Sequence, residues 1–233
     1  AAALRRLTRP LLSPGADPEA YLRGALSQKR RSELRRCRRR LAEQGGLEVT
    51  SHRGTAEVRQ AFEEFLALEA SGWKGQARTA LAQRGATTLA LFRRIIEGLS
   101  RDGLVKIMAL RLSGRAVAME VTLRCGGIGH TWKCAYDESL RSFGPGLLLM
   151  EDMTRAMLAD HDLKHVDMSN NRDFVSLGGV GAFWPERHEG GDLPVDVRAT
   201  ASLDVALASL ASRLRGVFRK RIQPLQPVSL SQP

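Results

Sequence analysis

The chain has 233 residues, of which 43% are hydrophobic and 26% are charged, as in an ordinary globular protein. No apolar run approaches the roughly 20 residues that cross a bilayer, and no secretory signal is recognisable. The three cysteines have no C-x-x-C spacing, which argues against a disulfide framework or a zinc site. We therefore expect a cytoplasmic protein with reduced thiols, no transmembrane segment and no metal.

The net charge of +11 is concentrated near the start of the chain. Residues 1–45 contain twelve Lys or Arg against four Asp or Glu, an excess of +8 that leaves only +3 for the rest. Such a localised excess is typical of contact with a polyanion such as RNA, an anionic lipid or a polysaccharide, and equally of a solvated arginine-rich face. We expect any polyanion contact to run through Lys29–Arg40.

Apolar residues at three- and four-residue spacing predict two helices with a buried face in the first half of the chain. Glycines in the stretch Gly72–Gly75 interrupt the first helix, and Asp102-Gly103 ends the second. The elements expected up to this point are, in order, an irregular arm with three prolines (1–18), a basic helix that is a remnant of, or linker to, a missing first lobe (19–45), a short strand (47–51), a helix (55–70), a short helical piece (77–84) and a helix (87–101).

The period of the pattern changes from 3.6 to 2 after Gly103. Alternating residues with tight turns at Ser113-Gly114 and Gly126-Gly127 predict an antiparallel meander of three strands. The elements expected after it are a helix from Pro145 to about Asp160, strands at 164–168 and 193–200, a helix from Ser202, and a disordered tail at 223–233. This order predicts an α+β (mixed α/β) fold, in which residues 46–222 form one domain.

The loop Arg141–Gly146 lies between the last meander strand and the start of a helix. Its glycines let the backbone approach a ligand, and the free N–H groups of the first helical turn, with the helix dipole, favour a diphosphate. Taken alone, Gly-Pro-Gly before a helix is equally typical of a turn followed by a cap.

The position of this loop, Arg-x-x-Gly-x-Gly after a meander, resembles the acyl-CoA loop of the GNAT N-acetyltransferase superfamily. Further stretches resemble its bacterial branch with a BioF2-like or cellulose-biosynthesis (CelD/BcsL-type) acetyltransferase domain, which is related to FemAB-type peptidyl transferases. Those stretches are Leu68–Gly75, Ala80-Leu81, Phe92, Trp132-Lys133, Ala135–Asp137, Pro145-Gly146, Asp167 and Phe183–Arg187. Proteins of this branch commonly have two lobes, whereas one lobe is recognisable here.

The resemblance implies a GNAT-like acyltransferase fold, a central, mostly antiparallel sheet flanked by helices, and acetyl-CoA as co-substrate. It also implies direct attack of an acceptor amine on the thioester, for which the protein must orient both substrates, remove a proton and stabilise the oxyanion. The residues expected to bind the cofactor are Arg141, Ser142, Phe143, Gly144, Gly146 and Leu147.

Glu120 is the preferred general base, because strand alternation places it on one face with Ala118 and Thr122. Tyr136 and Asp137 follow at the end of the next strand, beside the loop. Each has an ordinary alternative: Glu120 on a solvated face, Asp137 as a turn or cap residue. The residues expected to bind the acceptor are Trp73, Lys74, Lys133, Asp167, Trp184 and Arg187, although the tryptophans equally suit a hydrophobic core and Asp167 a strand end.

These features predict an acyl-CoA-dependent N-acyltransferase, most simply an N-acetyltransferase acting on a primary amine of a small molecule or of a polysaccharide or cell-envelope precursor. One alternative is a tRNA-dependent aminoacyl transferase of the FemAB type. Another is a polyanion-binding module with a degenerate acyltransferase core, although Lys29–Arg40 has no aromatic residue for base stacking.

Overall fold

The computed structural model describes residues 5–169 and 180–192. Contacts within the chain divide it into two compact units, Arg9–Arg187 and a smaller one made of Ala1–Thr8 and His188–Pro233. The larger unit contains every described helix and the strands that surround the candidate site. The strand and helix expected after residue 192, and the tail at 223–233, lie outside the described residues.

A seven-stranded, mostly antiparallel sheet forms the centre of the fold, as predicted. Its strand order is β2-β3-β4-β5-β6-β1-β7, and β5 and β6 run parallel to each other. The meander of β3, β4 and β5 is confirmed, and β2 extends it by pairing antiparallel to β3. The strands are β1 (Arg5–Leu12), β2 (Leu47–His52), β3 (Val105–Leu112), β4 (Arg115–Cys125), β5 (Ile128–Tyr136), β6 (His165–Asp167) and β7 (Glu186–Asp192).

Strands β5 and β6 stay together over only three residue pairs. Ile128, Gly129 and His130 of β5 pair with the three residues of β6. Strand β5 then continues to Tyr136, six residues further, with no pairing to β6. The backbone of β5 from Thr131 onward therefore has an edge that β6 does not cover, and this edge opens towards the candidate site.

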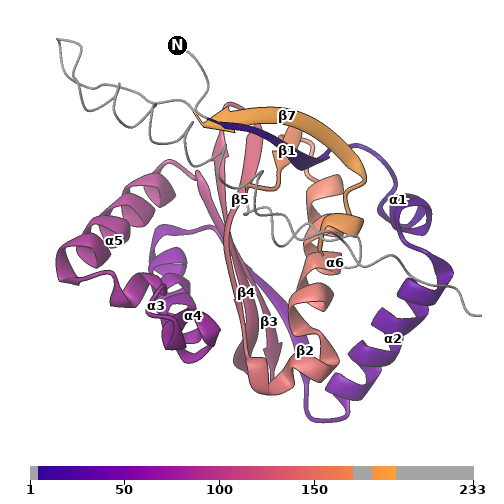
Figure 1. Cartoon of the computed structure of the whole chain (residues 1–233), viewed down its shortest axis with the longest axis horizontal. Coiled ribbons are helices and arrows are strands. Elements are labelled where there is room, and N and C mark those ends of the chain that lie inside the picture. Colours follow the sequence, from indigo (N-terminus) through magenta and orange to yellow (C-terminus); the bar gives the residue numbers. More distant parts are fainter. Residues whose placement is uncertain (1–4, 170–179, 193–233) are drawn as a thin grey trace, which may run out of the picture. The chain divides into compact units, whose positions relative to one another are not determined.

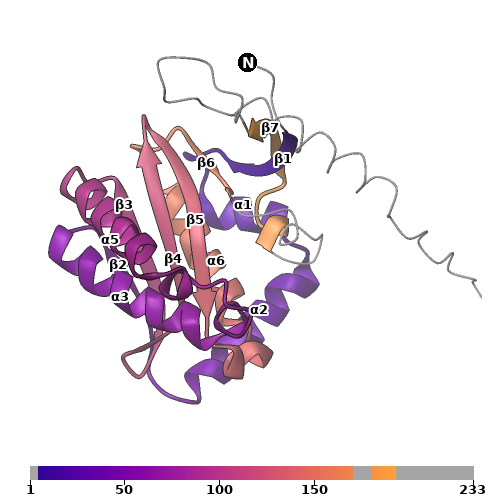
Figure 2. The same ribbon diagram turned by 60° about the vertical axis from the view of Figure 1, so that its left-hand side comes forward.

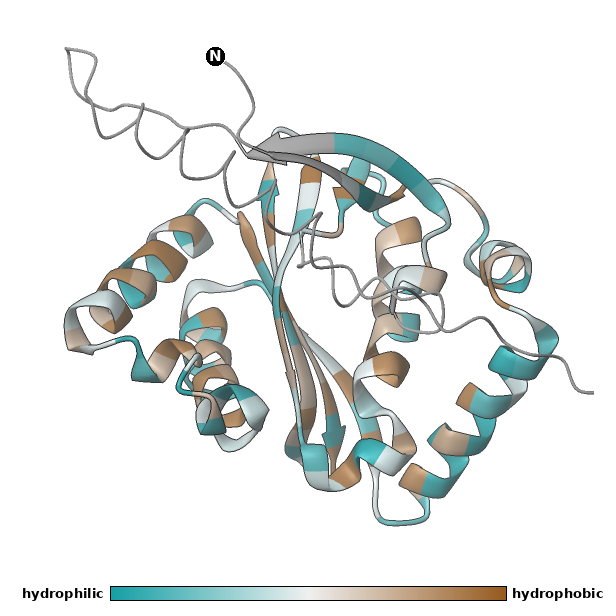
Figure 3. Ribbon diagram, viewed as in Figure 1, coloured by the Kyte–Doolittle hydropathy of each residue, from teal (hydrophilic) through white to brown (hydrophobic). Residues whose placement is uncertain are grey.

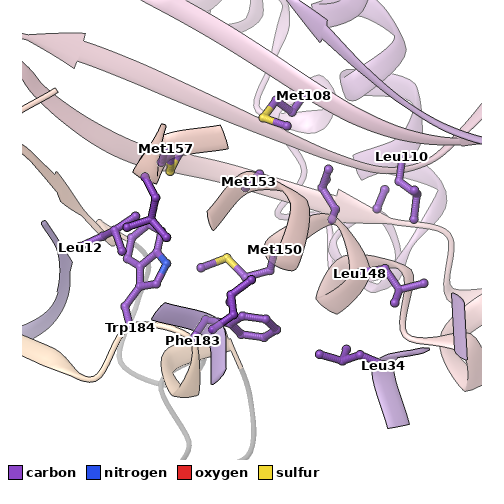
Figure 4. Close-up of a cluster of buried hydrophobic side chains, with 14 of the residues drawn as sticks. Leu12, Leu34, Met108, Leu110, Leu148, Met150, Met153, Met157, Phe183 and Trp184 are labelled. Atoms are coloured by element: carbon purple, nitrogen blue, oxygen red, sulfur yellow. The ribbon is translucent and has the colours of Figure 1, made fainter. Parts of the chain in front are cut away.

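Helices cover both faces of the sheet (Figures 1 and 2). One face packs against α3 and α5 through a cluster that includes Phe62, Phe65 and Ile96. The other face packs against α6, with α1 and α2 outside it, and Figure 4 shows the core between them. The helices are α1 (Pro18–Ala25), α2 (Gln28–Ala42), α3 (Thr55–Ser71), α4 (Trp73–Gln76), α5 (Ala86–Arg101) and α6 (Pro145–Leu158), with 3₁₀ turns η1 (Leu81–Gln83), η2 (Glu138–Phe143) and η4 (Val180–Ala182).

The structure corrects the expected organisation of the first 45 residues. Residues 5–12 form strand β1 instead of an irregular arm, because Leu11 and Leu12 pair with β6, more than 150 residues away in sequence. Pairing between segments so far apart leaves no local signal in the sequence, and the prolines favoured the interpretation as an irregular arm.

The basic segment forms two helices instead of one. The first ends at Ala25, and Ser27 caps the second, since its hydroxyl accepts a hydrogen bond from the N–H of Arg30. Both helices bury leucines in the same core as α6, so they belong to the larger unit and are not a separate stub. Figure 3 shows the hydrophilic residues along much of α2. None of the helices in the described ranges is long and apolar enough to cross a membrane.

Candidate functional site

A pocket of about 310 Å³ lies where the α3–α4 corner, strands β4 and β5, and the start of α6 meet. This volume falls within the range of small-molecule sites. The lining is Leu68, Glu69, Gly72, Trp73 and Lys74 from the corner, Met119, Glu120, Thr131, Cys134, Ala135 and Tyr136 from the strands, and Glu138, Arg141, Gly144, Pro145, Gly146, Leu147, Leu149, Met150, Met153 and Met168 from η2, α6 and the end of β6.

One end of the pocket is the glycine loop. Gly144 has a φ of +58°, which favours glycine, and it caps α6 at its N-terminus. Pro145 has no N–H, and the N–H groups of Leu147 and Leu148 both point back to the Gly144 carbonyl, at 2.9 and 3.1 Å. Within the described part of the chain, the N–H of Gly146 is not among the donors to this carbonyl, so it is available to a ligand. With the helix dipole and Arg141 in the same lining, this end favours an anion.

Gly146 also lies against the ring of Tyr136. A Cβ added to this glycine would be 3.5 Å from Cδ1 of Tyr136. Strand β5 therefore ends directly over the first turn of α6, and this contact places the free edge of β5 beside the glycine loop.

Glu120 lies in the middle of the pocket floor, on β4, opposite Cys134 of β5. It is only 5% exposed, and its Oε1 has no hydrogen-bond partner among the residues that the structure describes. Burial raises the pKa of Glu120 well above its usual range, and the positive charge of Lys74 offsets only part of this. A buried carboxyl group with a raised pKa in a pocket is a candidate for proton transfer.

Cys134 is not a nucleophile in this environment. Burial, together with the charge of Glu120, raises the pKa of the Cys134 thiol to about 12. The thiolate, which is the reactive form, is therefore scarce at neutral pH. This agrees with a direct transfer that needs no covalent intermediate.

The sequence analysis missed Glu69, the second buried carboxylate of the pocket. Its side chain is 0% exposed, and its Oε1 accepts hydrogen bonds from Lys74 Nζ at 3.3 Å and Lys133 Nζ at 3.1 Å. Its Oε2 accepts the N–H of Leu81 at 2.7 Å. Glu69 continues the buried stripe of α3 three residues after Leu66, and a charged residue at such a core position is the signal that could have revealed it.

The stretch Gly72–Gly75 turns the chain so that Lys74 reaches inward and Trp73 stays outside. A Cβ on Gly75 would lie 1.8 Å from the carbonyl oxygen of Ala70, so only glycine fits there. Lys74 Nζ then donates to the carbonyl of Cys134 at 2.6 Å, beside the free edge of β5. Trp73 is 45% exposed at the pocket, and its N–H donates to Glu138 at 2.7 Å.

Asp137 does not line the pocket. It pairs with Arg115 at 2.7 Å, and its Oδ1 accepts from the N–H and the hydroxyl of Ser139. Burial acts to raise the pKa of Asp137, but the hydrogen bonds from Ser139 and Arg115 outweigh it, and the pKa lies below its usual value. These contacts fit a capping residue, the ordinary alternative from the sequence.

The structure brings eight of the fifteen predicted site residues into one pocket: Trp73, Lys74, Glu120, Tyr136, Arg141, Gly144, Gly146 and Leu147. Besides Asp137, the residues that do not line it are Lys133, Ser142, Phe143, Asp167, Trp184 and Arg187. Three of them have other contacts: Lys133 bonds to Glu69, Phe143 faces Arg40, and Asp167 pairs with Arg9.

Trp184 and Arg187 serve the fold. Trp184 is fully buried in the core with Leu12 and Met157 (Figure 4), and its Nε1 donates to Thr154 Oγ1 at 3.0 Å. The guanidinium of Arg187 donates to backbone carbonyls, among them those of Trp184 and Gly181. The sequence predicted that both residues bind the acceptor. Their contacts in the structure are those of core packing for Trp184 and of a turn for Arg187.

The basic residues of α2 divide into paired and exposed side chains. Arg38 forms ion pairs with Glu151 and Asp152 of α6. The guanidinium of Arg40 lies 5.3 Å from the centre of the Phe143 ring, directly before the glycine loop. The exposed basic side chains of this helix are Lys29, Arg35, Arg36, Arg39 and Arg40.

The fold has a GNAT-like architecture, and comparison with known proteins agrees with it. The family described as "Acetyltransferase (GNAT) domain" matches residues 28–174, more than half of the chain. The chain therefore belongs to this family of acyl-transferring enzymes, whose members use acyl donors of the CoA type in general.

One solved structure, FemX, shares the fold at low identity, and two further structures match with lower scores. FemX matches with 12% identity and a TM-score of 0.52, over 79% of this chain and 60% of that chain. The C-terminal domain (DUF2156) of a protein described as a lysylphosphatidylglycerol synthetase from Agrobacterium fabrum matches with 13% identity and a TM-score of 0.47, over 79% and 59%. A conserved protein of unknown function from Bacteroides thetaiotaomicron VPI-5482 matches with 12% identity and a TM-score of 0.45, over 70% and 53%.

This chain thus spans three fifths or less of each of these structures. No curated protein matches the sequence.

Proposed function

We propose that this protein is an acyl-CoA-dependent N-acyltransferase, which moves an acetyl or longer acyl group directly from CoA to a primary amine. The amine belongs to a small molecule or to a polysaccharide or cell-envelope precursor. The observation that carries the proposal is one pocket that joins a glycine loop at a helix N-terminus to a buried carboxyl group with a raised pKa.

Donor binding rests on two backbone features. The N–H of Gly146, the start of α6 and Arg141 favour the diphosphate of CoA. The uncovered edge of β5 offers backbone groups to the amides of an extended pantetheine arm, as an edge strand does to an added strand. Together they direct the thioester from the loop towards Glu120.

The transfer itself needs a base and a positive charge near the carbonyl. The amine nitrogen attacks the thioester carbon, Glu120 accepts the proton released by the amine, the C–S bond breaks, and the CoA sulfur leaves as thiolate and takes up a proton. A raised pKa suits Glu120 to this task, because a base works best when its pKa lies near the operating pH. The ammonium of Lys74, in the same lining, favours the negative charge that develops on the carbonyl oxygen.

A second candidate is transfer from a donor carried by RNA. The observation that favours it is the row of exposed basic side chains on α2, a helix that contacts η2 and reaches the glycine loop through Arg40 and Phe143. A tRNA body held along α2 would leave its acylated end near the pocket. Under this alternative, tRNA and not CoA stabilises the protein.

Thermal unfolding with acetyl-CoA, longer acyl-CoAs and tRNA tests the proposal. A bound acyl-CoA at 100 times its Kd stabilises the fold by about 2.7 kcal/mol. We expect Gly146→Val to raise the apparent Kd for acyl-CoA at least tenfold. A branched side chain at this position blocks the approach to its backbone N–H and meets Tyr136. Gly98→Val is the matched control, since a Cβ there meets no atom within 4 Å. An unchanged melting temperature with every acyl-CoA contradicts the proposal.

A further inference from the structure

The pocket continues past Glu120 to a second end that a two-carbon acyl group does not fill. Along α6, the lining runs from Gly146 through Met150 to Met153, seven residues or about 10 Å from the start. Along β5, it runs from Tyr136 past Cys134 to Thr131, about 16 Å. Because Glu120 is opposite Cys134, the reaction centre lies between the glycine loop and this far end.

The far end is lined mainly by methionine. Met153 is 2% exposed and Met168 1%, and Met168 lies level with Thr131, because the preceding residues His130 and Asp167 are paired. Methionine side chains are unbranched and adapt to aliphatic ligands of different length. A donor that enters from the loop would therefore place the tail of its acyl group, beyond the thioester, among these side chains.

One polar group stands in this apolar wall. Thr131 is 2% exposed, and its Oγ1 has no hydrogen-bond partner in the described part of the chain. A buried hydroxyl without a partner is unfavourable, so its presence in a ligand-sized pocket indicates an oxygen atom on the ligand. Trp73, from the α3–α4 corner, is exposed at the pocket and marks a place where an acceptor can enter.

We propose that the preferred acyl group is longer than acetyl and carries a hydroxyl or keto oxygen on its chain, which is held by Thr131 while the methionines cover the aliphatic carbons. This inference rests on the proposed use of acyl-CoA and names the class of acyl group. The thioester is transferred as described above, with the chain oxygen unchanged.

Calorimetric titration of the full chain with CoA, acetyl-CoA, butanoyl-CoA and 3-hydroxybutanoyl-CoA, in the absence of amine, tests it. Each methylene buried at the far end tightens binding about fourfold. The hydrogen bond from Thr131 adds about two- to twelvefold for the hydroxyacyl donor. Equal Kd values for all three acyl donors, with CoA itself bound, overturn the inference and leave the proposed function intact. Absence of binding by CoA and every donor contradicts both.

Two pairs of variants place the effect at the far end. Thr131→Val removes the hydroxyl at nearly constant shape and is expected to abolish the preference for 3-hydroxybutanoyl-CoA over butanoyl-CoA, whereas Thr122→Val, its cross-strand neighbour outside the lining, keeps it. Met153→Phe is expected to reduce the butanoyl-to-acetyl affinity ratio at least fivefold, whereas Met157→Phe, one turn along α6 and outside the lining, leaves it unchanged. Each readout is the ratio of two Kd values measured with the same variant, so partial unfolding affects both values equally and leaves the ratio unchanged. A hydroxyacyl preference that survives Thr131→Val overturns the assignment of Thr131.

Discussion

Two buried carboxyl groups line the same pocket, and their surroundings are opposite. At the α3–α4 corner, Glu69 receives hydrogen bonds from two lysines and a backbone N–H. In the middle of β4, Glu120 leaves Oε1 without a partner in the described chain. Because a buried polar group is normally satisfied, Glu69 fits a residue that holds the site together, while Glu120 fits one that meets a substrate.

This difference separates positioning from chemistry within one site. Glu69 holds Lys74, whose ammonium in turn reaches the Cys134 carbonyl, so in the proposed mechanism Glu69 acts through Lys74. Glu120 has the raised pKa of a proton acceptor. We therefore expect the loss of the Glu120 carboxylate to lower mainly the reaction rate, and the loss of the Glu69 carboxylate to lower mainly the stability.

The largest expected effect is on the rate of Glu120→Gln. The amide keeps the shape of the side chain and cannot accept a proton, so kcat is expected to fall about 10²- to 10⁴-fold with a folded protein. Steady-state kinetics with an acyl-CoA and a panel of amines measure it, and circular dichroism verifies the fold. A kcat within threefold of the wild type would remove Glu120 from the role of base.

The next effect is on the stability of Glu69→Gln. This change leaves Lys74 and Lys133 without their shared carboxylate in a largely buried setting, and we expect the free energy of unfolding to fall by about 3 kcal/mol. Glu63→Gln is the matched control on the same helix, because the pair of Glu63 and Arg93 is about half exposed and is expected to contribute little to stability. Urea unfolding compares the two. Equal losses would mean that the Glu69 cluster adds nothing to the fold.

The fold was largely predictable because most of its elements carry a local signal. Helices α3, α5 and α6 and strands β3 to β5 follow apolar periods of 3.6 and 2 within single segments. Strand β1 was missed because it depends on pairing with β6, which no local pattern encodes.

Pocket residues that belong to a local sequence motif could be predicted, whereas those that only the folded chain brings together could not. The glycine loop and Glu120 were predicted from a loop motif and from strand alternation, and both line the pocket. Glu69 and Met153 were not predicted as site residues, because only the folded chain shows that both line one pocket. Asp137 and Trp184 were assigned to chemistry although capping and packing use the same residue types.

The pH dependence of stability sharpens the comparison from the side of Glu120. Its pKa is raised in the folded chain, so the folded state binds this proton more tightly than the unfolded state does. The resulting stabilisation is fully present below the pKa that Glu120 has in the unfolded chain. It is lost as the pH rises through the pKa that Glu120 has in the folded chain. Relative to Glu120→Gln, the wild type should lose up to about 1.4 kcal/mol per pH unit in this window. Urea unfolding of both proteins from pH 4 to 9 measures the difference, and a difference that does not change with pH contradicts the raised pKa.

The smallest expected effect concerns the exposed charges on the surface of α2. Arg35, Arg36, Arg39 and Arg40 are all exposed, and Arg40 also faces Phe143. Replacing Arg35, Arg36 and Arg39 with Gln removes charge with little change in helix propensity, so we expect acetyl-CoA affinity to change less than twofold.

Any binding of tRNA or anionic vesicles at low salt should weaken in the same variant, with a shallower dependence on salt, because fewer counterions are released. Arg40→Gln alone serves as the comparison, since it removes the contact with Phe143. A tenfold loss of acetyl-CoA affinity in the triple variant would extend the donor site from the glycine loop onto α2. If the wild type binds neither polyanion at low salt, the exposed arginines form a solvated face and the RNA-carried donor is excluded.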